Sequence, residues 1–268
     1  MRYPPALIAV AILCTVLMSR SPALAEEAHA AIQIPVEERQ IVQERMALAQ
    51  SLPQEFLAFA LKNYQRQIRD YTCLFVKQEL VQGKLTKEQH IEVKFREGPF
   101  AVFMQWVKNP SLVDHVLYVK GRHGDKALVK PAGVLGWFVP THVKRGVNSP
   151  DSAKVSRRRL DQFGFGNALD LIHETNTRAE KAGDLKLTYK GEGQIDDRKT
   201  FVLERKLPDK PEYPDQKLVV HVDQEWLVPV ATYCYDAHNR LLGKYEYRDV
   251  KLNVGLSWKE FTAEANDL

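Results

Sequence analysis

The amino-acid sequence predicts an α+β fold that is mostly β, in which a curved antiparallel sheet of about ten strands has helices packed against it. Apolar and polar residues alternate with a period of two in a series of short runs, and turn-forming residues separate these runs. Two other segments place apolar residues at helical spacing, and strands do not alternate with helices as they do in parallel sheets. The predicted strands are Tyr71–Leu80, His90–Arg96, Phe100–Val107, His115–Val119, Lys126–Lys130, Leu185–Lys190, Thr200–Lys206, Lys217–Asp223, Val228–Asp236 and Leu241–Asp249.

The first 25 residues have the layout of a secretory signal peptide. Arg2 precedes an apolar run at residues 6–18, and the small-x-small tripeptide Ala23-Leu24-Ala25 follows a polar break. The apolar run is shorter than the roughly 20 residues that a helix needs to cross a bilayer. We therefore predict a Sec-type signal cleaved after Ala25 and a periplasmic or otherwise extracytoplasmic location. A retained membrane anchor is the alternative.

The rest of the chain divides into a partly helical N-terminal extension at residues 26–50 and a domain at residues 51–268. The domain has the length of one large β domain or two small ones, and we predict a single one.

Two helices are predicted from apolar stripes at helical spacing. The first runs from about Pro53 to Ile68, and Ser51 is its expected cap. The second runs from about Ala168 to Lys181, after Asn167 as the expected cap. Each stripe must pack on another element of the fold.

The charge of the exported chain is that of an ordinary protein surface. The whole chain has a net charge of +4, and removal of residues 1–25, with Arg2 and Arg20, leaves about +2. Such a balance produces no long-range field that would attract nucleic acid, so we predict no nucleic-acid partner. The basic run Arg157, Arg158 and Arg159 is either a solvated loop or a peripheral contact for anionic lipid head groups or for a negatively charged partner.

Two cysteines remain in the exported chain, Cys73 and Cys234, and both lie in predicted strands. In an oxidising compartment they could form a disulfide. As buried free thiols they would act as small apolar residues. The sequence leaves both alternatives open.

Common catalytic and cofactor motifs are absent from the sequence. It contains no G-x-S-x-G elbow, no phosphate-binding loop and no H-E-x-x-H pair, and its eight histidines are scattered. We therefore predict a protein that is not an enzyme, with no catalytic residue, no metal site and no cofactor. A hydrolase whose residues converge from different strands is an alternative.

The sequence has more apolar material than a single sheet needs. The strand Phe100–Val107 is apolar on both faces, and the loop at residues 134–139 contains Trp137 and Phe138. A curved sheet covered by helices can enclose an apolar cavity. Because loops are usually hydrated, this loop must tuck under the sheet, cover the opening of a cavity, or dock on a partner.

The C-terminal motifs resemble a known family. The runs Val222–Val230 (VDQEWLVPV), Tyr245–Val250 (YEYRDV) and Asn253–Leu256 (NVGL), followed by Phe261, resemble the ending of LolA/LolB-type lipoprotein carriers of the periplasm. More closely, residues 50–265 resemble an uncharacterised bacterial family of secreted proteins in that superfamily.

This resemblance implies an unclosed barrel with a helical lid on its concave face and an apolar interior that accepts acyl chains. It also implies an arginine that reaches from the sheet to the lid, for which Arg96 is the candidate. The proline-rich loop at 208–214 and the basic insertion near 157 depart from the pattern of a dedicated carrier.

We therefore predict a LolA-like half-barrel that binds or carries a lipid or a lipoprotein acyl chain. Alternatives are an envelope sensor or scaffold that binds a protein partner, and the hydrolase mentioned above. Either face of the strand Phe100–Val107 could point inward. The predicted cavity residues are Val93, Phe95, Val102, Met104 and Trp106, with Trp137 and Phe138 at the mouth.

Overall fold

The computed structural model describes residues 36–133, 142–149 and 156–268. The chain divides into two units, residues 1–40 and residues 41–268. Helix α2 (Val36–Ser51) begins in the first unit and continues into the second. Within the described ranges, no helix has both the length and the hydrophobicity to cross a membrane. The predicted signal peptide and the predicted mouth residues Trp137 and Phe138 lie outside the described residues.

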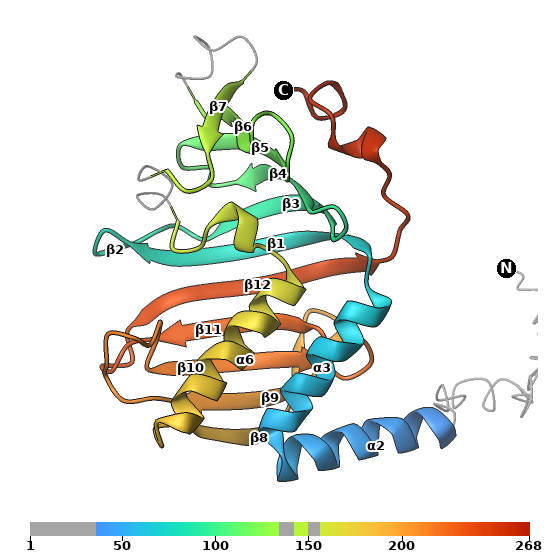
Figure 1. Ribbon diagram of the computed structural model, residues 1–268, viewed down its shortest axis with the longest axis vertical. Helices are drawn as coiled ribbons and strands as arrows, with labels where there is room; N and C mark the ends of the chain where they lie inside the picture. The colour runs from blue at the N-terminus through green and yellow to red at the C-terminus, as the bar shows by residue number, and fades with distance from the viewer. Residues whose placement is uncertain (1–35, 134–141, 150–155) are drawn as a thin grey trace, which may run out of the picture. The chain divides into compact units, whose positions relative to one another are not determined.

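The second unit is built on a twelve-stranded antiparallel sheet, which confirms the predicted fold class (Figure 1). All ten predicted strands are present, and the short strands β2 and β7 are additional. The strands are β1 (Asp70–Val81), β2 (Lys84–Leu85), β3 (Gln89–Arg96), β4 (Ala101–Lys108), β5 (Val113–Val119), β6 (Lys126–Pro131), β7 (Val143–Gly146), β8 (Lys186–Ile195), β9 (Arg198–Lys206), β10 (Lys217–Asp223), β11 (Pro229–Tyr235) and β12 (Leu241–Leu252).

Two meanders meet at the centre of this sheet. The strand order is β7-β6-β5-β4-β3-β1-β12-β11-β10-β9-β8, and β2 pairs with β1 outside this path. The first strand therefore lies beside the last one, with Phe75 opposite Tyr247 and Glu79 opposite Gly243. This central pair joins strands at opposite ends of the domain sequence and holds the two meanders in one layer.

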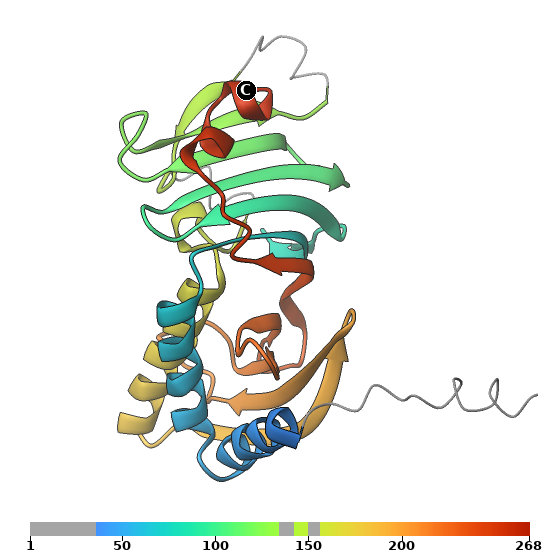
Figure 2. The same cartoon turned by 90° about the vertical axis from the view of Figure 1, so that its right-hand side faces the viewer.

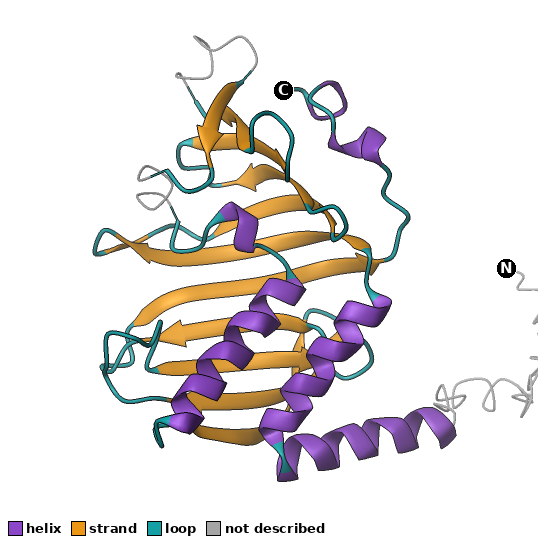
Figure 3. Ribbon diagram, in the orientation of Figure 1, coloured by secondary structure: helices purple, strands orange, loops and turns teal. Residues whose placement is uncertain are grey.

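Helices α3 (Pro53–Gln67) and α6 (Phe165–Lys181) lie side by side across the concave face of the curved sheet (Figures 2 and 3). Their contact is close at Gly166, where a Cβ atom would lie 2.4 Å from a ring carbon of Tyr64. No side chain larger than hydrogen fits there without moving the Tyr64 ring. Apolar residues of both helices, including Phe56, Leu57 and Leu169, enter the main core against the sheet.

The two predicted helix caps are wrong. Helix α2 extends to Ser51, whose hydroxyl donates to the Ala47 carbonyl at 2.7 Å, and Leu52 occupies the cap position of α3. Because Ser51 lies within a helix, its side chain bonds back to the preceding turn and does not cap the next helix. Helix α6 begins earlier than predicted, after Gly164, and the Asn167 side chain donates to the Phe163 carbonyl at 2.8 Å.

The C-terminal segment covers part of the opposite, convex face of the sheet (Figure 2). It contains two short 3-10 helices, η3 (Trp258–Phe261) and η4 (Glu264–Asn266). Phe261 packs with Phe103 and Leu117 in a second apolar core. This cover explains why β4 is apolar on both faces, since Val102 and Met104 belong to the main core on the concave side.

Arg96 does not reach the helices, contrary to the role that the resemblance suggested. Its Nη1 donates to the Leu256 carbonyl at 3.0 Å, and its guanidinium carbon lies 4.6 Å from the centre of the Trp258 ring. Arg122 lies over the same ring at 4.9 Å. Because side chains alternate between the faces of a strand, Arg96 points to the convex side and anchors the C-terminal segment.

Cys73 and Cys234 are buried free thiols. Cys234 lies opposite Gly243, and Gly243 lies opposite Glu79 of β1. Glu79 is six positions along β1 from Cys73. At about 3.3 Å per residue this separation is roughly 20 Å, whereas disulfides need Cα atoms about 4.4–6.8 Å apart. Burial raises the pKa of the Cys234 thiol to about 12, so it stays protonated and acts as a packing residue.

Candidate functional site

A cavity of about 840 Å³ lies between the concave face of the sheet and helix α6. Its other wall is the segment that leads into α6, which includes the 3-10 helix η2 (Leu160–Gln162). Over strands β3 to β6 the walls are mainly apolar. The apolar lining there includes Ile91, Met104, Trp106, Val113, Val116 and Val129.

The predicted cavity residues separate into two groups. Met104 and Trp106 line the cavity, whereas Val93, Phe95 and Val102 are buried in the core beneath the same face and are not among the described lining residues. For Phe95 an aromatic cluster explains the difference, because other rings pack against it. In it the Phe95 ring stacks on Tyr71 at 4.7 Å between centroids and lies 6.0 Å from Phe163.

Charged residues line the other end of the cavity, over strands β1 and β9 to β12. One row of register partners crosses five strands, and it ends in a carboxylate on β1 and a guanidinium on β9. The row consists of Glu79, Gly243, Cys234, Leu218 and Arg205. Paired residues of an antiparallel sheet point to the same face, so both charges point to the concave side.

Glu79 is the centre of a buried hydrogen-bond network. The residue is 1% exposed, and its carboxylate accepts from Lys77 Nζ at 3.0 Å, from the Tyr245 hydroxyl at 2.8 Å and from the Ser156 hydroxyl at 3.0 Å. The backbone N–H of Arg157 donates to it at 3.2 Å. Burial raises the pKa of Glu79, but the Lys77 charge and these hydrogen bonds outweigh burial, so the pKa lies below its ordinary value.

A glycine allows this network to form. A Cβ atom at Gly243 would lie 2.8 Å from the Tyr245 ring and from its hydroxyl oxygen. The ring therefore lies over the glycine, and the hydroxyl reaches Glu79 on the neighbouring strand. A larger residue at position 243 would displace the ring and remove one hydrogen bond from the carboxylate.

Arg205 forms a second buried ion pair at the same end of the cavity. Its Nη2 donates to Asp215 at 2.9 Å, and both residues are 2% exposed. Its Nη1 donates to the Asn176 side chain on α6 at 3.0 Å, and Asn176 donates to Gln54 on α3 at 2.9 Å. The pair thus links the sheet to both helices.

The sequence analysis did not identify the residues of these two ion pairs. A signal is present in β1, because Lys77 and Glu79 continue the period of the buried residues Cys73 and Phe75. Two charges at apolar positions of a strand indicate a buried ion pair. No comparable local signal brings Arg205 to the same site, since its position depends on the pairing of five strands.

The basic run Arg157, Arg158 and Arg159 borders the cavity. Arg157 donates to the Pro214 carbonyl at 3.2 Å, and Arg159 pairs with Asp161, with Nε–Oδ1 at 2.9 Å. Arg158 and Arg159 both belong to the cavity lining.

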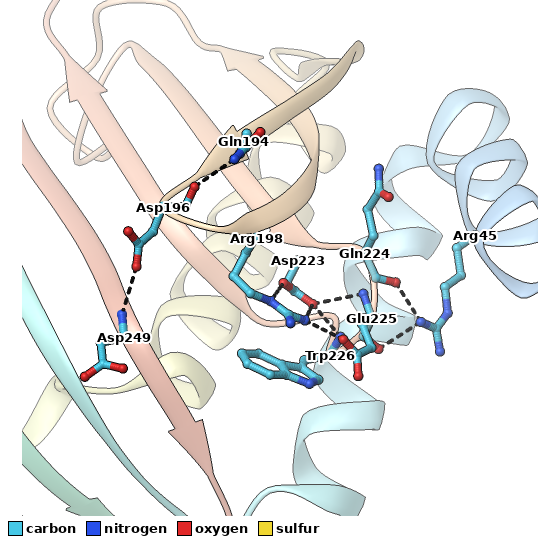
Figure 4. Close-up of polar contacts among 9 residues, drawn as sticks. All are labelled: Arg45, Gln194, Asp196, Arg198, Asp223, Gln224, Glu225, Trp226 and Asp249. Carbon is cyan, nitrogen blue, oxygen red and sulfur yellow. Dashed lines mark hydrogen bonds and ion pairs between the residues drawn. The ribbon is translucent and has the colours of Figure 1, made fainter. Parts of the chain in front are cut away.

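A second polar cluster surrounds the turn between β10 and β11, where one of the C-terminal motifs lies (Figure 4). Asp223 accepts from Arg198 Nε at 2.7 Å and from the backbone N–H of Trp226 at 2.6 Å. The Arg198 guanidinium carbon lies 3.5 Å from the centre of the Trp226 ring, and Arg45 of α2 donates to the Glu225 carbonyl at 2.9 Å. These contacts fix the turn and join it to α2, so we assign the cluster a structural role.

Metal-ligating side chains do not gather in the described ranges. No group of three or more histidine, cysteine, aspartate or glutamate side chains in those ranges could hold a metal ion.

Solved structures are similar to this one at low sequence identity. MucB is 14% identical with a TM-score of 0.50; the match covers 81% of this chain and 64% of MucB, so the chain spans less than two thirds of MucB. A LolA superfamily protein from Nitrosomonas europaea is 16% identical, with a TM-score of 0.32 over 76% of this chain and 96% of that one. Lipoprotein LppX from Mycobacterium tuberculosis is 12% identical, with a TM-score of 0.44 over 77% and 98%.

At 14% identity, the similarity to MucB concerns the fold alone. No curated protein matches the sequence. The model of one protein family matches residues 68–267, a range that includes every strand of the sheet and begins just after helix α3. The chain therefore belongs to the family described as "Protein of unknown function (DUF1571)".

Proposed function

We propose that this protein is an extracytoplasmic binding or carrier protein that holds the apolar part of a lipid, or of a lipoprotein acyl chain, without performing chemistry on it. The observation that carries the proposal is the cavity of about 840 Å³ between the sheet and α6. Protein interiors are normally packed to the density of organic crystals. A hollow of this size lies within the range of about 300–1,000 Å³ that is typical of small-molecule sites.

The chemistry of the walls supports an acyl chain as the ligand. Met104, Val116 and Val129 contribute apolar surface from three adjacent strands. Each methylene group that moves from water into such surroundings contributes about 0.8 kcal/mol. Affinity should therefore rise with chain length until the apolar end of the cavity is full.

The N-terminal sequence supports the proposed compartment. An exported protein meets lipids and lipoproteins between membranes, where an acyl chain in water needs cover. A protein that only shields such a chain needs walls and an opening, and it needs no nucleophile or general base.

Filling the cavity tests this proposal. Val129→Trp places an indole in the apolar end, whereas the matched Val107→Trp changes a residue on β4 that is 48% exposed and follows the lining residue Trp106. Neighbouring residues of a strand point to opposite faces, so the indole introduced by Val107→Trp would lie outside the cavity. We expect Val129→Trp to weaken binding of a fluorescent fatty-acid analogue at least tenfold and Val107→Trp to bind it like the wild type.

Circular dichroism of both variants provides the folding control. Equal binding by the wild type and Val129→Trp would place the ligand elsewhere. A wild-type protein that binds no fatty-acid analogue would refute the proposed function. In that case a stoichiometric protein partner in material purified from the native envelope would favour the scaffold alternative.

A further inference from the structure

The charged end of the cavity contains a cation that has no ion-pair partner in the described ranges. Two ion pairs lie there. Glu79 pairs with Lys77 at 3.0 Å, and Asp215 pairs with Arg205 at 2.9 Å. Arg158 also lines the cavity, and its guanidinium forms no ion pair with any residue in the described ranges.

Arg158 is placed where a ligand in the cavity would meet it. It is half-buried, it belongs to the lining, and it lies close enough to Tyr245 and Cys234 to affect their ionisation. Its backbone N–H contacts the Ser156 hydroxyl at 3.4 Å, and Ser156 is bound to Glu79. The buried network therefore holds the backbone of Arg158, and within the described residues no carboxylate pairs with its side chain.

A second unsatisfied donor lines the same end. The Nε–H of Arg205 is buried and has no acceptor within the described part of the chain, although the other two nitrogens of this guanidinium are bound. A buried donor without a partner is unfavourable by about 1–3 kcal/mol. An oxygen atom of a bound ligand would satisfy it.

The other acidic lining residues of the cavity belong to α6. Asp170 and Glu174 of α6 line the cavity, and Asp170 has Glu174 and His173 as its electrostatic neighbours. Neither carboxylate forms an ion pair with Arg158 in the described part of the chain. An anionic group of a ligand would be attracted to Arg158.

We propose that the ligand is a single-chain anionic amphiphile, whose carboxylate or phosphate binds Arg158 while its chain lies along the apolar walls over β4 to β6. The proposal rests on the proposed function and specifies its ligand class. Both ends belong to one continuous cavity. Charge-assisted hydrogen bonds from a guanidinium are stronger than neutral ones, and a partly buried site increases their strength.

Three probes with the same chain test the head-group preference. Palmitate and hexadecyl phosphate have anionic head groups, and hexadecanol has a neutral one. We expect the wild type to bind at least one anionic probe tenfold or more tightly than hexadecanol by isothermal titration calorimetry. The tighter of the two anions identifies carboxylate or phosphate as the natural group.

Variants assign the preference to Arg158. Arg158→Gln should reduce the ratio between anionic and neutral probes to about one while it leaves hexadecanol affinity unchanged, and Arg158→Lys should retain part of the ratio. The control Arg66→Gln removes the same charge from an exposed position on α3 outside the cavity lining. It should behave like the wild type.

Three results would overturn the inference and leave the proposed function standing. The first is equal affinity of the wild type for anionic and neutral probes. The second is an unchanged preference in Arg158→Gln, and the third is loss of the preference in Arg66→Gln. Failure of all three probes to bind would instead refute the proposed function and the inference together.

Discussion

At the residue scale, the buried carboxylate of Glu79 connects the fold to the cavity. The groups that surround it come from its own strand, from β12 and from the segment at 156–157 that forms a cavity wall. Buried ion pairs contribute little net stability when both partners are present, but the loss of one partner is strongly destabilising. Removal of Glu79 should therefore strongly reduce the stability of the fold. Through Ser156, Glu79 also fixes the position of the Arg158 backbone.

Glu79 should give the protein a specific acid sensitivity. Its pKa is lowered in the folded state from an ordinary value of 4.5, so its ionisation stabilises the fold above that value, and the contribution is lost as the pH falls through the lowered pKa. We expect Glu79→Gln to reduce the free energy of unfolding at pH 7 by about 3 kcal/mol, the order found for broken buried pairs.

Urea unfolding at pH 7, 5 and 3 checks this prediction. The difference between the wild type and Glu79→Gln should be nearly constant from pH 7 to pH 5 and should shrink at pH 3. A difference that stays constant down to pH 3 would show that the charge of Glu79 does not contribute.

At the element scale, strand β4 shows what a local pattern predicts and what it leaves open. Its residues are apolar on both faces, which correctly predicts that both faces are covered. The pattern does not reveal that the C-terminal segment provides the second cover, because that contact joins positions about 160 residues apart in the sequence. The assignment of Arg96 to the lid failed for the same reason.

The C-terminal segment should stabilise the fold without taking part in binding. Phe261 is 1% exposed and packs against the convex face, on the opposite side of the sheet from the cavity. We expect Phe261→Ala to lower the free energy of unfolding by about 3–5 kcal/mol, the usual effect of removing a buried phenylalanine. Thermal unfolding measures the loss, and palmitate affinity at 20 °C should stay within about twofold of the wild type. A large loss of affinity in the folded variant would show that the two faces are coupled.

At the scale of the whole molecule, local alternation located all ten predicted strands, because side chains of a half-buried strand alternate wherever it lies. The sequence did not predict the pairing of β1 with β12, since no local signal specifies a partner about 170 residues away. This pairing brings Glu79 into one row with Arg205. The apolar end of the cavity was therefore partly predictable, through Met104 and Trp106, whereas the charged end was not.

The division of the concave face is also a property of the whole molecule. Val93, Phe95 and Val102 follow the same alternation as Met104 and Trp106, yet they are buried in the main core, where the Phe95 ring packs against Tyr71 and Phe163. Alternation predicts which face a residue occupies. It does not predict whether that part of the face is filled or hollow, because this depends on side chains from the helices.

A crystal structure of the wild-type protein with palmitate tests most directly whether the hollow between α6 and the sheet holds an acyl chain. We expect continuous electron density for the chain against Met104, Val116 and Val129, with the carboxylate at Arg158. A chain bound outside this space, or a cavity filled by the protein's own side chains in the presence of palmitate, would contradict the account.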